Sequence, residues 1–151
     1  MKKISSYEEA VEFAIEREEE AIQAYGEMSR KVKTPGLREL LLELQKEEKN
    51  HRKLLEELSR DKIDFLESVS VPDLKISDYT VDEPTGADMS LQDLLIFAAK
   101  KEQKAADFYA ELAKTSKKKK LKKLFDYLVQ QEKTHKLKLE TEYENHVLEE
   151  G

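Results

Sequence analysis

The sequence contains no cysteine, and only four glycines and three prolines among its 151 residues. Without cysteine the chain has no disulfide, zinc–thiolate site, iron–sulfur cluster or thiol nucleophile. Any bound metal must therefore be held by carboxylate, imidazole and water. The shortage of glycine and proline, together with 40% charged residues, is typical of long helices with solvated outer faces. The regular apolar spacing argues against disorder.

Long apolar runs and excess positive charge are also missing. No stretch approaches the roughly 20 apolar residues that span a bilayer. The first residues, which begin Met1-Lys2-Lys3-Ile4, contain no apolar core of a signal peptide. The formal charge of −6 disfavours a nucleic-acid partner, because phosphate binding needs a basic surface. We therefore expect no membrane or nucleic-acid partner, and a cytoplasmic location by default.

Apolar periodicity and end signals predict four helices, over residues 7–31, 37–60, 91–114 and 121–147. Ser6 and Ser90 are suitable N-caps, with Glu9 and Asp93 three residues further on. The chain is expected to break at residues 34–36, which read Thr-Pro-Gly, and to turn at the lysine run 117–120. Residues 61–89 are predicted to form a long connection rather than a further core helix.

Short connections join helices 1–2 and 3–4, and a long one joins the two hairpins. One long crossover is the connectivity of ferritin-like four-helix bundles. The predicted fold is therefore an all-α four-helix bundle with one long crossover between helices 2 and 3. It forms a single domain of residues 1–151.

The two predicted hairpins, over about residues 6–58 and 90–142, match each other without a gap. Residues 84 positions apart are identical at many places, among them Phe13 and Phe97, Leu44 and Leu128, and Leu55 and Leu139. Such a register predicts an internal duplication and a pseudo-two-fold axis through the bundle.

Two of the three histidines fall in Glu-x-x-His motifs that match in the repeat, Glu48 with His51 and Glu132 with His135. Residues i and i+3 share one face of a helix, so the two side chains of each pair can bind the same ion. The repeat also pairs Glu18 with Glu102. One Glu from each of two helices and Glu-x-x-His from each of the others is the di-iron carboxylate arrangement. The predicted metal ligands are Glu18, Glu48, His51, Glu102, Glu132 and His135.

The charges of this set are self-consistent, because four carboxylates balance two divalent ions. Oxygen and imidazole ligands without sulfur suit two Fe ions, with Mn or Zn possible. We expect Glu48 and Glu132 to bridge the ions. The alternative is a plain bundle in which these residues are surface charge. Tyr25 and Tyr109 are interpreted equally well as hydrogen-bond donors to the ligands or as core aromatics. His146 has no counterpart in the repeat, and we expect it at the surface.

The motifs Glu18-x-x-Ala21-x-x-x-Tyr25 and Glu48-x-x-His51, with their counterparts at 102–109 and 132–135, resemble the rubrerythrin-like branch of the ferritin-like superfamily. The resemblance implies a non-haem di-iron centre that reacts with peroxide or oxygen, in a homodimer or larger homo-oligomer. Rubrerythrins also carry a cysteine-rich electron-transfer module, so its absence here implies an external electron donor. They have an additional carboxylate where this chain has Ala105, which makes the site more similar to the six-ligand centre of ferritin and bacterioferritin.

Three functions remain open at this point. The first is an oxidoreductase, a di-iron peroxidase or ferroxidase, whose catalytic residues are the metal ligands themselves. The second is iron binding or storage without catalytic turnover. The third is a structural helical module with a vestigial metal site, for which the 61–89 connection is a candidate partner surface.

Overall fold

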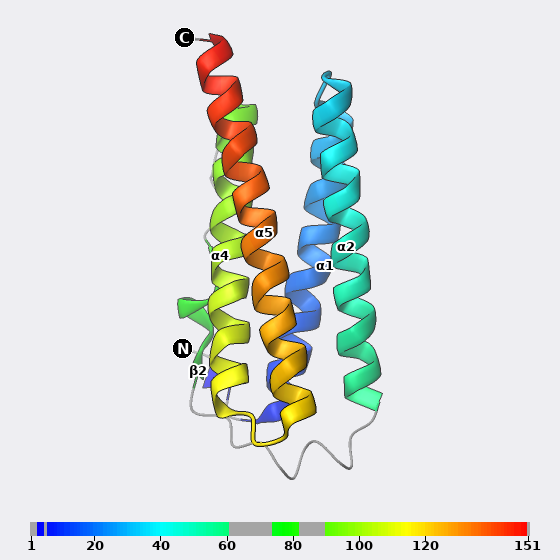
Figure 1. The fold of residues 1–151 in the computed structure, drawn as a ribbon, viewed down its shortest axis with the longest axis vertical. Coiled ribbons are helices and arrows are strands. Elements are labelled where there is room, and N and C mark those ends of the chain that lie inside the picture. Colours follow the sequence, from blue (N-terminus) through cyan, green and yellow to red (C-terminus); the bar gives the residue numbers. More distant parts are fainter. Residues whose placement is uncertain (1–2, 5, 61–73, 82–89, 151) are drawn as a thin grey trace.

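Four long helices run side by side along the long axis of the molecule (Figure 1). The computed structural model describes residues 3–4, 6–60, 74–81 and 90–150. Helices α1 (Tyr7–Lys31) and α2 (Pro35–Arg60) form one hairpin, and α4 (Leu91–Thr115) and α5 (Lys119–Glu150) form the other. The chain passes from one hairpin to the other between Arg60 and Leu91. The predicted all-α bundle with one long crossover is confirmed.

Both predicted N-caps close the first turn of their helices. The Ser6 hydroxyl accepts a hydrogen bond from the backbone N–H of Glu9 at 3.1 Å. The Ser90 hydroxyl accepts one from the N–H of Asp93, also at 3.1 Å, and the Asp93 carboxylate accepts from the Ser90 N–H. These bonds satisfy N–H groups that a helix start leaves without intrahelical partners.

Two helix starts differ from the prediction. Helix α2 begins at Pro35 rather than residue 37, so the break spans only residues 32–34. Proline is favoured at the first helical position, where its missing N–H costs nothing. Helix α5 begins at Lys119, so half of the lysine run 117–120 is helical. Lysine is a good helix former, and its charge alone does not stop a helix.

The described part of the crossover contains a short strand that the sequence did not predict. Strand β2 (Leu74–Lys75) pairs antiparallel with β1 (Lys3–Ile4), with Ile4 opposite Leu74. A 3₁₀ turn, η1 (Ile76–Asp78), follows. Strands of two residues are too short to show a sequence period. This sheet ties the crossover to the N-terminal segment, and both Ile4 and Leu74 are buried.

Two apolar clusters fill the bundle on either side of a buried layer of charged residues. One cluster includes Leu55, Phe108 and Phe125, and the other includes Leu41, Leu95 and Leu139. Leu74 belongs to the first cluster, and Tyr79 packs edge-on against Phe108 with ring centroids 5.1 Å apart. The described crossover residues therefore cover the bundle. The rest of the proposed partner surface, and the side chain of His146, lie outside the described residues.

None of the helices in the described ranges combines the length and the apolar character needed to cross a membrane.

Candidate metal centre

The six predicted ligands are brought together in the middle of the bundle. Glu18 comes from α1, Glu48 and His51 from α2, Glu102 from α4, and Glu132 and His135 from α5. Each is at most 3% exposed. Side chains of Glu are almost never buried unless they are paired or bind a metal. This burial contradicts the interpretation of the six residues as surface charge.

The six side chains form two overlapping groups. Glu18, Glu48, His51 and Glu132 make one group, and Glu48, Glu102, Glu132 and His135 make the other. Within each group, the ligand atoms lie within 4.8 Å of one another. Glu48 and Glu132 belong to both groups, so their carboxylates lie where a bridging ligand must lie. Glu18 and Glu102 each belong to one group, as terminal ligands would.

Both imidazoles turn Nδ1 toward the carboxylates. Nδ1 of His51 lies 2.9 Å from Glu132 Oε1, and Nδ1 of His135 lies 2.7 Å from Glu48 Oε1. The rings stack with centroids 5.6 Å apart and an interplanar angle of 10°. Each group thus presents one imidazole nitrogen and three carboxylates to its centre.

Tyr25 and Tyr109 hydrogen-bond the terminal glutamates, and they do so across the hairpins. The hydroxyl of Tyr25 on α1 donates to Glu102 Oε1 at 2.5 Å, and that of Tyr109 on α4 donates to Glu18 Oε1 at 2.7 Å. Burial, reinforced by the neighbouring carboxylates, raises the pKa of both tyrosines well above 10.0. Each hydroxyl therefore remains a donor at neutral pH, and the two bonds link the halves of the bundle.

The protein alone does not compensate the negative charge of this cluster. Burial, reinforced by the other carboxylates, raises the pKa of Glu48 and Glu132 well above 4.5. Burial also acts to raise the pKa of Glu102, but the nearby Glu132, His135 and Tyr25 outweigh it and the net shift is downward. Burial lowers the pKa of His135, whereas Glu102 and Glu47 raise it, and the net shift is upward. Without a cation the cluster therefore retains protons.

The donor atoms fit a pair of divalent cations. Buried atoms without a hydrogen-bond partner among the described residues include one oxygen of each of the four glutamates and Nδ1 of both histidines. Buried polar atoms are rarely left without a partner unless a water or an ion is bound. Oxygen and imidazole donors are the ligands expected for iron or manganese, and less selectively for zinc.

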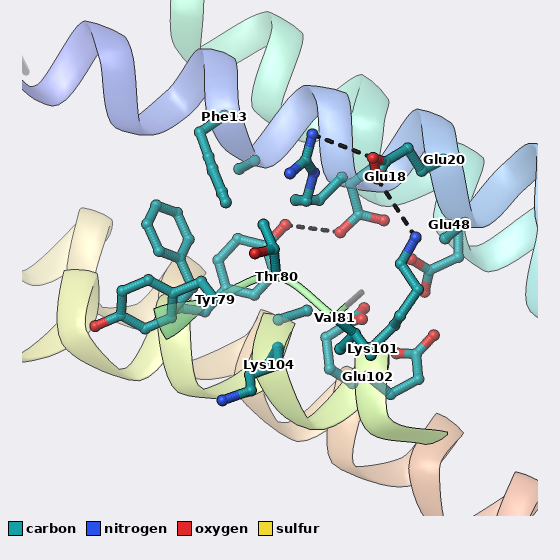
Figure 2. Close-up of a pocket in the computed structure, with 17 residues that line it drawn as sticks. Phe13, Glu18, Glu20, Glu48, Tyr79, Thr80, Val81, Lys101, Glu102 and Lys104 are labelled. Atoms are coloured by element: carbon teal, nitrogen blue, oxygen red, sulfur yellow. Dashed lines mark hydrogen bonds and ion pairs between the residues drawn. The ribbon is translucent and has the colours of Figure 1, made fainter. Parts of the chain in front are cut away.

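A cavity of about 90 Å³ leads from the carboxylates to the surface between α1 and α4 (Figure 2). Its walls include Phe13, Ala21, Ala105, Phe108 and Val81, and the segment 79–81 crosses it. At its outer end, Glu20 pairs with Arg17 at 3.2 Å and with Lys101 at 3.4 Å. The lining of the cavity thus extends from the buried carboxylates to charged side chains at the surface.

Neither this cavity nor the contact of the Glu47 carboxylate with Nε2 of His135 could be predicted from the sequence. Glutamate is so common in this chain that Glu47 carries no signal by itself. Its one distinguishing mark is that the repeat aligns it with Gln131 instead of another glutamate.

Residues 9–143 match the family model for rubrerythrin. The chain belongs to the rubrerythrin family. This family assignment covers all four helices and confirms the resemblance noted from the ligand motifs, while the role of each residue as a ligand stays a prediction.

Two solved structures are similar to this rubrerythrin-family chain. A hypothetical protein from Pyrococcus furiosus is 31% identical, with a TM-score of 0.72, over 91% of this chain and 87% of the other. A candidate ferritin-like diiron-carboxylate protein from Thermotoga maritima is 21% identical, with a TM-score of 0.78, over 95% of this chain and 98% of the other. The second likeness shows the fold alone. The comparison with curated proteins gave no match.

Proposed function

We propose that this protein is a di-iron oxidoreductase that reacts with peroxide or oxygen at the buried carboxylate–histidine cluster. The observation that carries the proposal is that Glu48 and Glu132 belong to both groups of converging ligand atoms. These two carboxylates would hold two ions close together. When bound, two Fe(II) ions supply the two electrons that cleavage of an O–O bond requires.

The protein's own residues prepare the cluster for this chemistry. The hydrogen bonds from Tyr25 and Tyr109 hold the carboxylates of Glu102 and Glu18 in fixed orientations. The apolar clusters on both sides keep bulk water away from the charged layer. Because the raised pKa of Glu48 and Glu132 favours their protonated forms, metal binding must displace protons from the cluster.

The cavity between α1 and α4 is the proposed route for the oxidant. The apolar side chains in its wall and its volume of about 90 Å³ suit a small, uncharged molecule, which the charged side chains at its outer end would not hold back. Ala105→Leu should narrow the cavity beside the cluster. We expect the rate of Fe(II) oxidation by peroxide to fall several-fold while the metal content stays unchanged. Ala110→Leu, an exposed position on the same helix, is the control.

The proposal includes an external electron donor, because the chain has no cysteine with which to build an electron-transfer module. It also includes a homodimer or larger assembly. Exposed apolar side chains on α2 and α5, Leu42 and Leu137, are 45% and 64% exposed and offer contact surface. Light scattering of the metal-loaded protein measures the size of the assembly.

The decisive test is anaerobic loading of the apoprotein with Fe(II), followed by peroxide or air. We expect about two Fe(II) per chain, rapid oxidation and the absorption of Fe(III). Glu132→Gln, which removes one shared carboxylate, should abolish most of this response. Oxidation no faster than in buffer would contradict the proposal.

A ferroxidase or iron-binding role is the second candidate, and the absence of a carboxylate at Ala105 favours it. The same loading experiment separates the two. A ferroxidase oxidises Fe(II) once and passes the product on, so adding an electron donor would not restore reactivity toward peroxide. In a peroxidase, the donor would restore the reactivity toward peroxide, and the protein would reduce peroxide repeatedly. Storage would instead give far more than two irons per chain.

A further inference from the structure

The far sides of the two buried imidazoles have different surroundings. Nε2 of His135 lies in hydrogen-bond contact with the carboxylate of Glu47. Nε2 of His51 has no hydrogen-bond partner among the described residues, and the ring of Tyr127 meets that imidazole edge-on with centroids 6.4 Å apart. The two halves of the cluster therefore have the same types of ligand on the Nδ1 side of the imidazoles and different surroundings on the Nε2 side.

The two halves of the repeat also differ at the residue that precedes each shared glutamate. Glu47 immediately precedes the shared ligand Glu48 on α2, and its side chain is 30% exposed. The residue 84 positions later is Gln131, which precedes Glu132 on α5. Glu47 reaches from α2 to the histidine of the opposite hairpin. In the repeat, the neutral Gln131 on α5 matches Glu47 on α2.

A carboxylate behind a metal-binding imidazole acts on the metal in two ways. It accepts a hydrogen bond from Nε2–H and so holds the ring in the tautomer whose Nδ1 lone pair is free for an ion. It also adds negative charge close to that ion. Around His135, Nδ1 faces Glu48 at 2.7 Å and Glu102 at 3.6 Å. Glu47 therefore supports the metal position that contains His135 and Glu102.

We propose that the two metal positions are unequal, and that Glu47 is a positioning residue that makes the His135 position the tighter one, which fills first. The position containing Glu18 and His51 binds its ion more weakly. This inference rests on the proposed di-metal centre. It goes further by giving the loading an order and by assigning that order to one residue.

The proposal is tested by calorimetric titration of the apoprotein with Co²⁺. This ion replaces Fe(II) so that oxidation does not accompany binding. We expect two steps in the wild type whose dissociation constants differ by about 10-fold or more. Glu47→Gln gives both halves of the repeat a glutamine before the shared glutamate. It should weaken the tighter step by about 10–100-fold and leave the weaker step unchanged, so that the two merge. Gln131→Glu should tighten the weaker step.

Glu43→Gln is the matched control, because Glu43 lies one turn earlier on α2, is exposed and pairs with Lys138 at 3.4 Å. It removes the same charge and should leave both steps unchanged. Diffraction at the Co absorption edge with one equivalent of Co²⁺ should find the ion beside His135. The visible spectrum of that first equivalent should change in Glu47→Gln.

The outcomes separate this inference from the proposed function. If the wild type binds no Co²⁺, both are overturned. If it binds two ions with equal affinity, or if Glu47→Gln weakens both steps alike or neither, the di-metal centre stands and the inequality is overturned. A melting temperature of apo Glu47→Gln close to that of the wild type would show that the selective loss is not caused by misfolding.

Discussion

The hairpin of α1 and α2 and the hairpin of α4 and α5 contribute the same residues to the centre. Each supplies one glutamate, one Glu-x-x-His pair and one tyrosine whose hydroxyl crosses to the other hairpin. One layer further out the match ends, since Glu47 contacts His135 whereas Gln131 stands in the corresponding place. The ligands of the two hairpins are therefore matched, whereas the residues that support those ligands are not.

The largest expected effect comes from the two shared glutamates, which should behave alike. Glu48→Gln and Glu132→Gln should each bind metal poorly. They should lose the stabilisation that metal binding gives, about 4 kcal/mol at a thousand-fold excess over Kd. Each should nevertheless stabilise the apoprotein by about 1 kcal/mol, because glutamine keeps the shape of a protonated carboxyl and removes the cost of protonating the buried carboxylate or of burying its charge. Metal analysis and thermal unfolding measure both quantities.

Glu20→Gln is the control for this pair, since Glu20 is exposed at the outer end of the cavity. It should change metal content and melting temperature little. If one shared glutamate behaved like this control while the other abolished binding, the assignment of both Glu48 and Glu132 to the two metal positions together would be wrong.

The pH dependence of the apoprotein gives the next largest effect. The folded pKa of Glu48 and Glu132 is raised above 4.5, and that of His135 is raised above 6.5, so the folded state holds more protons than the unfolded state at neutral pH. The stabilisation is present at low pH and is lost as the pH rises through the folded values. Unfolding free energy should therefore increase from about pH 8 to about pH 5, by about 1.4 kcal/mol per pH unit for each extra proton.

Glu102 has the opposite sign, but its lowered pKa confines its effect to pH values below 4.5. Urea unfolding in the presence of a chelator measures the trend. Glu48→Gln should flatten it, because one of the raised carboxyls is removed. Stability that instead fell steadily from about pH 8 to about pH 5 would contradict a proton-retaining cluster.

The crossed tyrosines test whether the two terminal glutamates are held equally. Tyr25→Phe and Tyr109→Phe each remove a buried hydrogen bond to a carboxylate, worth about 1.5–3 kcal/mol. Each should also weaken metal binding by about 10-fold. Chemical denaturation and metal titration measure the two losses. Tyr143→Phe, at a partly buried position beside one apolar cluster, should show neither. If only one of the two variants lost stability and metal affinity, the two hairpins would be matched in their ligands but not in their tyrosine hydrogen bonds.

The smallest expected effect is at the helix starts. Ser6→Ala and Ser90→Ala each remove an N-cap bond of 3.1 Å. Each should lower the unfolding free energy by about 1 kcal/mol without changing metal content. Thermal unfolding of the apoproteins compares the two. A cost at Ser90 alone would mean that the stability of the first hairpin does not depend on its N-cap.

Much of the centre could be predicted from the sequence because its signals are local. Glu48 and His51, like Glu132 and His135, lie three residues apart, and that spacing places both side chains on one face of any helix. The gapless repeat then selected Glu18 from a run of three glutamates. The helix starts at Ser6 and Ser90 could be predicted for the same reason, because an N-cap residue and the N–H group that it binds are three residues apart.

Other features depended on segments that meet only in the folded protein. Glu47 and His135 are 88 positions apart, and the tyrosine bonds span 77 and 91 positions. Whether such groups touch depends on how each helix is rotated against its neighbours, which no local pattern encodes. The cavity beside Ala105 and the pairing of β1 with β2 have the same origin. The sequence by itself determined the helices and the six converging side chains, because these follow from spacing along one helix and from the repeat. Only the tertiary structure decided which residues stand behind those side chains, because contacts between helices are set by packing across the whole bundle.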